Sequence, residues 1–118
     1  MTLARERCVA CRRDSPRVTQ EDIAELHPLI PDWELTETDG IKRLARSFRF
    51  PNFASALSFS TQVGEEAEME GHHPRITLEW GRVGVEWWTH KIRGLHRNDF
   101  IMASKTDHIF LRGFATGE

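Results

Sequence analysis

Two short turn sequences constrain the fold of this chain more than any other feature. Asp39-Gly40 and Gly81-Arg82 each separate two segments in which apolar and polar residues alternate. Dipeptides of this kind are strong signals for β-hairpins, and alternation with a period of two indicates strands with one buried face. The sequence therefore predicts two hairpins, one in each half of the chain.

The strands of these hairpins are predicted from the alternation on either side of each turn. The first hairpin is expected to run through 33–35 and to return through 41–50, with one face buried (Leu44, Arg46, Phe48 and Phe50) and the other wet (Arg43, Ala45, Ser47 and Arg49). The second is expected to run through 75–80 and to return with Val83, Val85, Trp87 and Thr89 on one face. His90 is then expected to end the fourth strand, on the face of Gly84, Glu86 and Trp88.

Three helices are predicted around the hairpins. Thr19 and Asp22 indicate a short first helix that ends near Pro31. Asn52 caps the long second helix, which ends at Gly71 and is expected to turn one stripe inward: Phe53, Ala56, Leu57, Ser60, Val63, Gly64 and Ala67. Its small residues, Ser60, Gly64 and Ala67, would allow close packing on the sheet, and its glutamates (Glu65, Glu66, Glu68 and Glu70) are interpreted as a solvated face. The closing helix is expected over 98–111.

The order helix, hairpin, helix, hairpin, helix predicts an α+β fold, in which three helices pack on one face of a four-stranded antiparallel sheet. A chain of 118 residues with 39% hydrophobic residues is the size of one globular domain. We expect a mobile arm over residues 1–17 and a single domain over 18–118. A domain this small buries a modest core, which favours a homo-oligomer.

The charge pattern excludes several classes of partner. The net charge is −2, and basic and acidic residues are mixed along the chain, which gives no reason to expect binding to nucleic acid or to an anionic membrane. No apolar stretch approaches the length of a membrane span, and the opening MTLARERC lacks the apolar region of a signal peptide. A cytoplasmic location is therefore expected.

Cys8 and Cys11 form an isolated CxxC pair in the charged N-terminal segment. A redox pair and half of a zinc site are the two functional interpretations of this spacing. A zinc site needs a second pair of ligands, and a redox CxxC is expected beside a strand–helix unit. Neither is present in the surrounding sequence, so we assign the pair no function.

Histidines provide the candidate catalytic groups. His72 and His73 follow the predicted end of the long helix, and His90 follows a strand, which are positions where a scaffold presents side chains to a ligand. Pro74 favours an extended backbone at His73, so the two neighbours are expected to point in different directions. An imidazole gives and takes protons near neutral pH. His27, His96 and His108 are interpreted as structural or surface residues.

Glu68, His72-His73-Pro74, Trp80, His90 and Asp99 together resemble the signature of the pterin-4a-carbinolamine dehydratases. The signature consists of an acidic residue, three further positions, His-His-Pro, an aromatic residue, a histidine and an aspartate. The resemblance also extends through the Asp39-Gly40 hairpin and the Gly94-Leu95 turn to nearly all of the chain after the arm.

The resemblance implies the sheet-and-helix fold described above, assembled as dimers or tetramers. It implies dehydration of 4a-hydroxytetrahydropterin to quinonoid dihydropterin, which recycles the cofactor of aromatic amino acid hydroxylases. Catalysis would fall on His72, His73 and His90, with no metal and no cofactor other than the pterin substrate itself. Thr89 and Pro74 would line the pterin site, and Glu68 and Asp99 would occupy its acidic positions.

Each of these roles has a structural alternative. Glu68 is either an exposed helix residue or a partner that orients a histidine, and Asp99 is favoured as a stabiliser of the last helix's N-terminus. Trp80 is favoured as a core or interface residue over a pterin-stacking one. The family often has Ser or Thr where this chain has His96, which puts the start of the last helix in doubt because histidine is a poorer cap.

Two other functions remain open alternatives. Three histidines can hold zinc with an open fourth position, although adjacent residues on an extended backbone are a poor chelating pair. The chain could also be a non-catalytic or moonlighting module, because relatives of the family serve as dimerisation partners of transcription factors or as assembly factors for enzymes. A pure scaffold has no need for three histidines, which favours the enzyme.

Overall fold

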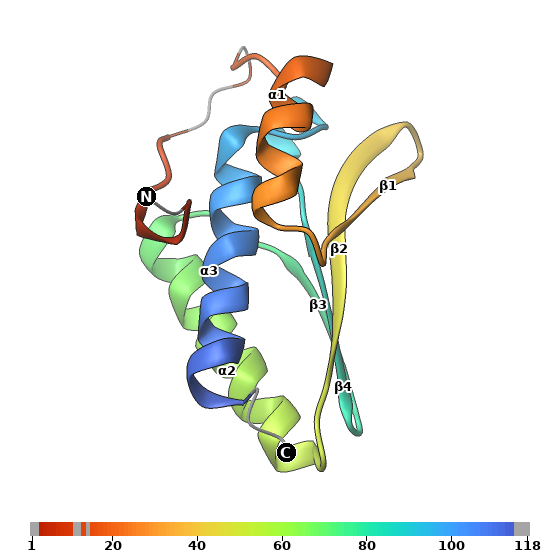
Figure 1. Ribbon diagram of the computed structural model, residues 1–118, viewed down its shortest axis with the longest axis vertical. Helices are drawn as coiled ribbons and strands as arrows, with labels where there is room; N and C mark the ends of the chain where they lie inside the picture. Colours follow the sequence, from red (N-terminus) through yellow and green to blue (C-terminus); the bar gives the residue numbers. More distant parts are fainter. Residues whose placement is uncertain (1–2, 11–12, 14, 115–118) are drawn as a thin grey trace.

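Four antiparallel strands form one sheet, and the helices lie against one of its faces (Figure 1). The computed structural model describes residues 3–10, 13 and 15–114. The strands are β1 (Glu34–Thr38), β2 (Ile41–Arg49), β3 (Arg75–Glu79) and β4 (Arg82–Trp87), in the spatial order β1-β2-β4-β3. The helices are α1 (Gln20–Leu26), α2 (Phe53–Glu70) and α3 (Arg97–Gly113). The predicted α+β fold is therefore confirmed.

The turns of both hairpins use backbone conformations that the sequence indicates. Asp39 and Gly40 have φ angles of 53° and 77°, and Gly81 has a φ angle of 74°. These left-handed conformations suit Gly and Asp and match the twist of a tight hairpin. They bring β1 back onto β2, and β3 onto β4, as predicted. The second turn is shifted by one residue, to Trp80-Gly81, because Arg82 already pairs with Glu79 as the first residue of β4.

The end of β4 differs from the prediction, because the strand stops at Trp87 and His90 does not belong to it. Thr89 instead exchanges two backbone hydrogen bonds with Gly94, over 2.8 and 3.4 Å, and this bridge turns the chain away from the sheet. His90 opens a short 3-10 helix, His90–Ile92. It therefore lies in the loop between β4 and α3.

Two arginines of β2 modify the expected division between buried and wet faces. Arg46, on the helix-covered face, forms an ion pair with Asp107 of α3 at 2.6 Å. Arg43, predicted to be wet, is only 7% exposed. Its guanidinium lies 3.9 Å from the centre of the Trp88 ring and bonds to Glu86 at 3.2 Å, so stacking on the open face of the sheet buries it.

The buried stripe of α2 differs partly from the predicted one. Asn52 caps the helix through the Ser55 amide, as expected, and the buried residues are Ala56, Phe59, Val63 and Ala67. Phe59, which the prediction omitted, packs on Phe48 at 4.8 Å between ring centres. Because Phe59 is large and apolar, the helix face that carries it packs against the sheet. Phe53 is consequently 44% exposed and Leu57 47% exposed. A Cβ placed on Gly64 would meet no atom within 4 Å, so that glycine does not hold α2 close to the sheet.

The starts of the other two helices are well capped. Thr19 and Asp22 form the predicted reciprocal cap of α1, and the chain then passes through a short 3-10 helix, His27–Leu29. The doubt about His96 was wrong: its Nδ1 accepts a hydrogen bond from the Asn98 amide at 3.0 Å, and its own amide donates to Asp99 at 2.9 Å. An imidazole nitrogen serves here as the acceptor that a hydroxyl provides in Ser or Thr.

The predicted N-terminal arm makes extensive contacts over its described part. Leu3 is 2% exposed and belongs to the core, and Lys105 of α3 donates to the Ala4 carbonyl at 2.8 Å. Glu6 forms an ion pair with Arg97 at 2.7 Å. The mobility expected of residues 1–17 stays a prediction, and Cys11 lies outside the described residues.

Among the residues that the structure describes, no helix is both long enough and apolar enough to span a bilayer.

Candidate active site

The end of α2 directs the two adjacent histidines to different environments. Gly71 takes the left-handed conformation, with a φ angle of 65°, and the His72 amide donates to the Ala67 carbonyl at 3.1 Å. This cap satisfies the last carbonyls of the helix and releases the chain toward Pro74 and β3. His72 is 8% exposed, whereas the side chain of His73 is 59% exposed.

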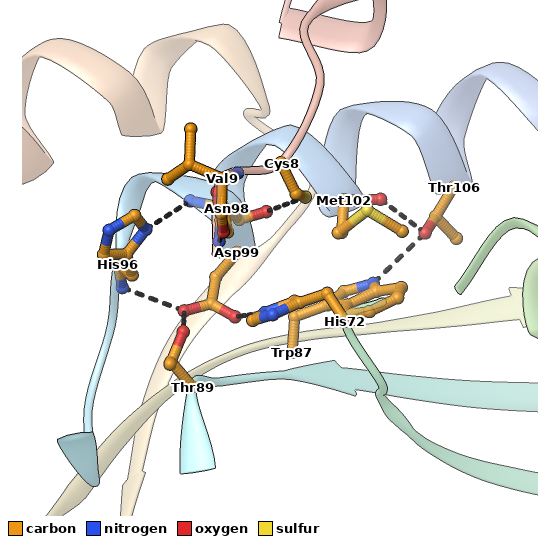
Figure 2. A network of polar contacts seen from close by, with 10 residues as sticks. All are labelled: Cys8, Val9, His72, Trp87, Thr89, His96, Asn98, Asp99, Met102 and Thr106. Carbon is orange, nitrogen blue, oxygen red and sulfur yellow. Dashed lines mark hydrogen bonds and ion pairs between the residues drawn. The ribbon is translucent and has the colours of Figure 1, made fainter. Parts of the chain in front are cut away.

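The buried histidine is held by a fully buried aspartate (Figure 2). His72 Nε2 lies 2.6 Å from Asp99 Oδ1, and Asp99 is 0% exposed. The second carboxylate oxygen accepts from the Thr89 hydroxyl at 2.7 Å and from the His96 amide at 2.9 Å. A carboxylate with three donors is well compensated for its burial. Because an ionised carboxylate only accepts, His72 carries its hydrogen on Nε2.

Trp87 stacks on one face of the His72 ring. His72 and Trp87 stack with their ring centres 5.9 Å apart and their planes 10° from parallel. Trp87 Nε1 donates to the Thr106 hydroxyl at 3.1 Å, which in turn donates to the Met102 carbonyl at 2.7 Å. The orientation of His72 is therefore determined by groups from α2, β4 and α3 together.

The exposed histidine has an acidic partner of its own. His73 Nε2 lies 2.5 Å from Glu68 Oε2, and the Glu68 side chain is 76% exposed. The structure thus shows the contact that a histidine-orienting glutamate would make. Asp99 also stands in the first turn of α3, where its bond to the His96 amide closes the helix cap. The structure thus shows the helix-terminus role that the sequence favoured for Asp99, and contact of Asp99 with substrate stays a prediction.

His90 stacks on Trp88, on the face of the sheet that the helices do not cover. Its ring lies on Trp88 with 4.5 Å between ring centres, and the same Trp88 carries the guanidinium of Arg43. Burial lowers the pKa of His90 from its ordinary value, and the neighbouring charge of His72 lowers it further. His90 is consequently neutral at pH 7 and available to accept a proton.

One cavity of about 580 Å³ brings the three histidines together. Its lining comprises Val9, Ala10, Glu70, Gly71, His72, His73, Thr89, His90 and Lys91. Cavities of this volume are typical of sites for small organic ligands. Of the residues predicted to contact substrate, Thr89 lines the cavity, whereas Glu68, Pro74 and Asp99 are outside the lining found in the described part of the chain.

Two features of the site were missed from the sequence. Glu70, interpreted as solvated, has a side chain only 3% exposed because it accepts from the Cys8 amide and from Arg7 Nε, both at 2.9 Å. Val9 and Ala10 line the cavity from a segment predicted to be mobile. Neither feature leaves a local pattern, since each depends on a contact between residues far apart in the chain.

Trp80, favoured as a core or interface residue, is 70% exposed at the turn between β3 and β4 and is absent from the core. Its place in an interface is untested. Within the described ranges, no three His, Cys, Asp or Glu side chains are arranged to hold a metal ion. The expectation of a reaction without metal or added cofactor stays a prediction.

The fold and the site define an α+β protein with a small-molecule cavity lined by histidines. A family model described as pterin 4 alpha carbinolamine dehydratase matches residues 16–109. The chain belongs to this family, whose name denotes a hydro-lyase, and the resemblance drawn from the signature residues is confirmed.

Three similar proteins illustrate the relationship. "Putative pterin-4-alpha-carbinolamine dehydratase 1" of Gloeobacter violaceus is 59% identical over 92% of this chain and 94% of its own. "Putative pterin-4-alpha-carbinolamine dehydratase" of Nitrosococcus oceani is 55% identical over 91% of this chain and 95% of its own. A crystal structure from Brucella melitensis, titled transcriptional coactivator/pterin dehydratase, has a TM-score of 0.71 and 32% identity, covering 80% of this chain and 98% of that one.

Proposed function

We propose that this protein dehydrates a 4a-hydroxytetrahydropterin to the quinonoid dihydropterin by histidine acid–base catalysis. The observation that carries the proposal is the single cavity lined by His72, His73 and His90. Membership of the dehydratase family supports the substrate class. A cavity of about 580 Å³ has room for a bicyclic ring.

The reaction needs one base and one acid. In a carbinolamine, the hydroxyl and a nitrogen share one carbon, so dehydration takes a proton from the nitrogen, forms a C=N bond and releases the hydroxyl as water. His90 is proposed as the base, because its lowered pKa keeps it neutral. His73 is proposed as the acid, because its exposure lets it regain a proton from solvent after each turnover.

His72 has a more constrained role in this mechanism. Asp99 occupies its Nε2, which leaves Nδ1 as the nitrogen that can meet substrate. Its ring is held by Asp99 on one side and Trp87 beneath, so its position changes little when the substrate binds. A fixed hydrogen-bonding group of this kind would orient the hydroxyl or the pterin ring for the proton transfers.

The direct test is a spectrophotometric assay of the purified full-length chain with synthetic 4a-hydroxytetrahydropterin, with and without EDTA. We expect water loss well above the spontaneous rate, and equal rates in both conditions, because the Nε2 atoms of His72 and His73 are bonded to carboxylates. A rate no higher than the spontaneous one would contradict the function. Loss of activity in EDTA, restored by Zn²⁺, would favour the metalloenzyme alternative.

The pH dependence follows from the state of His90. Its pKa is lowered by burial, and its basic form is present above that pKa. We therefore expect kcat/KM to rise with pH through a midpoint below 6.5, the ordinary pKa of histidine, as His90 loses its proton. Initial rates between pH 5 and 9 would check this, and a flat profile would contradict histidine control if the chemical step limits the rate.

The assembly and the cellular setting are proposals of the same kind. Phe53, Leu57 and Trp80 are 44%, 47% and 70% exposed, which supports burial in a homodimer or homotetramer. An aromatic amino acid hydroxylase, as the consumer of tetrahydropterin, and a cytoplasmic location complete the proposal.

The non-catalytic alternative is the weaker one. The Brucella protein carries both a coactivator and a dehydratase name. A scaffold alone gains nothing from a neutral, partly desolvated His90 facing a cavity, or from an aspartate buried to orient His72. A second, binding role alongside catalysis is compatible with the exposed apolar side chains.

A further inference from the structure

Part of the lining of the cavity that the three histidines share, the wall at Val9 and Ala10, comes from the N-terminal segment. The family model begins at residue 16, yet Val9 and Ala10 line the same cavity as the three histidines. The remaining lining is mostly polar or titratable: Glu70, His72, His73, Thr89, His90 and Lys91. Sites for planar organic ligands are lined predominantly by apolar groups with a few polar ones. Within the described lining, Val9 and Ala10 are the residues whose side chains are purely aliphatic.

Asn98 holds this wall by both of its amide atoms. The Val9 amide donates to Asn98 Oδ1 at 3.0 Å, and Asn98 Nδ2 donates to the Val9 carbonyl at 2.7 Å. The side-chain amide thus pairs with Val9 as a neighbouring strand would (Figure 2). Asn98 is 2% exposed, so these bonds lie in a poorly solvated place, where losing either one is costly.

Glu70 attaches the N-terminal segment a second time, at Cys8, the residue before Val9. Its carboxylate accepts from the Cys8 amide and from Arg7 Nε, each at 2.9 Å, and its side chain is 3% exposed. Both attachments adjoin the hydrogen-bonded pair His72–Asp99 in sequence: Glu70 precedes His72 by two residues, and Asn98 precedes Asp99. The backbone that positions His72 and Asp99 consequently positions the wall as well.

We propose that Val9 and Ala10 form the apolar wall of the pterin site and that Asn98 is the positioning residue that holds this wall in place. The inference rests on the proposed function and extends it by assigning substrate binding to residues outside the family model. Val9 is 62% exposed, so it is open to contact one face of a bicyclic ring. The wall contacts the substrate throughout the reaction and takes no part in proton transfer.

The test replaces Val9 with serine, which removes apolar surface without adding charge near the histidines. We expect V9S to raise KM about fivefold, the effect of losing part of a valine's apolar contact, and to leave kcat within about twofold. Leu111→Ser is the matched control, because Leu111 is 65% exposed on α3 and outside the cavity lining. An unchanged KM in V9S, or an equal rise in L111S, would overturn the proposal.

Asn98→Ala tests the attachment through a double-mutant cycle. Releasing the wall should raise KM as V9S does, and N98A/V9S should raise it no further than the larger single effect, because both changes remove the same contact. Effects that multiply in the double variant would show that Asn98 does not act through Val9.

Binding of dihydrobiopterin, followed by calorimetry, separates this inference from the proposed function. If the wild-type chain fails to dehydrate its substrate, the function fails while calorimetry still tests the wall. If the wild-type chain is active and V9S binds dihydrobiopterin as tightly as wild type does, the proposed role of Val9 is contradicted while the proposed function stands.

Discussion

Replacing His90 with alanine is expected to lower kcat by about two to four powers of ten, the usual contribution of a general acid or base. The pKa of His90 is lowered, mainly by burial, which keeps this imidazole neutral at pH 7. Its removal takes away the neutral base without disturbing the buried Asp99 network, in which it makes no bond. His73→Ala is expected to cost a similar factor through loss of the acid.

The pH profiles of these variants carry more information than their rates alone. H90A should lose the rise of kcat/KM at acidic pH, whereas H73A should keep that rise. His108→Ala is the matched control, because His108 is exposed on α3 and lies outside the histidine-lined cavity. Near-wild-type turnover in H90A or H73A would remove that residue from the mechanism, and an unchanged rise at acidic pH in H90A would assign the base to another group.

Local sequence signals predicted the elements of this fold well. Asp39-Gly40 and Gly81 adopt the left-handed conformations that their residue types favour, and Thr19, Asn52 and Gly71 act as the helix caps that were expected. Each of these features depends on a few consecutive residues and on backbone sterics. Such signals are readable without knowing what the rest of the chain does.

Predictions that depended on partners from distant segments were less accurate. Glu70 was predicted to lie on a solvated face because the glutamates next to it in the sequence form one. Arg7 and the Cys8 amide instead bury its carboxylate. Arg43 follows the alternation of its strand, but Trp88 covers it. Hydrophobic periodicity predicts which face of a helix or strand is buried. It cannot predict that a charged side chain becomes buried by pairing with a residue far away in the sequence.

The site itself shows the same division. His72, His73 and His90 could be selected from their positions at element ends and from the family signature. The arrangement around them could not, because the Asp99 network joins the segment after α2, the loop after β4 and α3 through groups that are separated in sequence. The apolar wall at Val9 was invisible for the same reason.

Replacing Asp99 with asparagine is expected to lower kcat by about two to three powers of ten and to reduce the free energy of unfolding by about 1–3 kcal/mol. The carboxylate accepts three hydrogen bonds, from His72, Thr89 and the His96 amide. An asparagine side chain has one acceptor oxygen, and its other end is an NH₂ group that only donates. Its NH₂ group must face either His72, which then has to move its hydrogen to Nδ1, or the His96 amide, which cannot rotate away.

Glu68→Gln is the matched comparison for Asp99→Asn, because each change neutralises a carboxylate bonded to one of the two adjacent histidines. The Glu68 side chain is 76% exposed, so solvent can replace its bond to His73, and we expect a loss in kcat below tenfold with unchanged stability. Steady-state rates and urea unfolding of both variants would check the pair. Equal losses in D99N and E68Q, or a D99N variant with wild-type turnover, would show that burial of the His72–Asp99 pair does not govern catalysis. A large difference in the expected direction would assign His72 its role through the orientation that Asp99 imposes, because shape and volume are conserved in both substitutions and only charge and hydrogen-bonding capacity change.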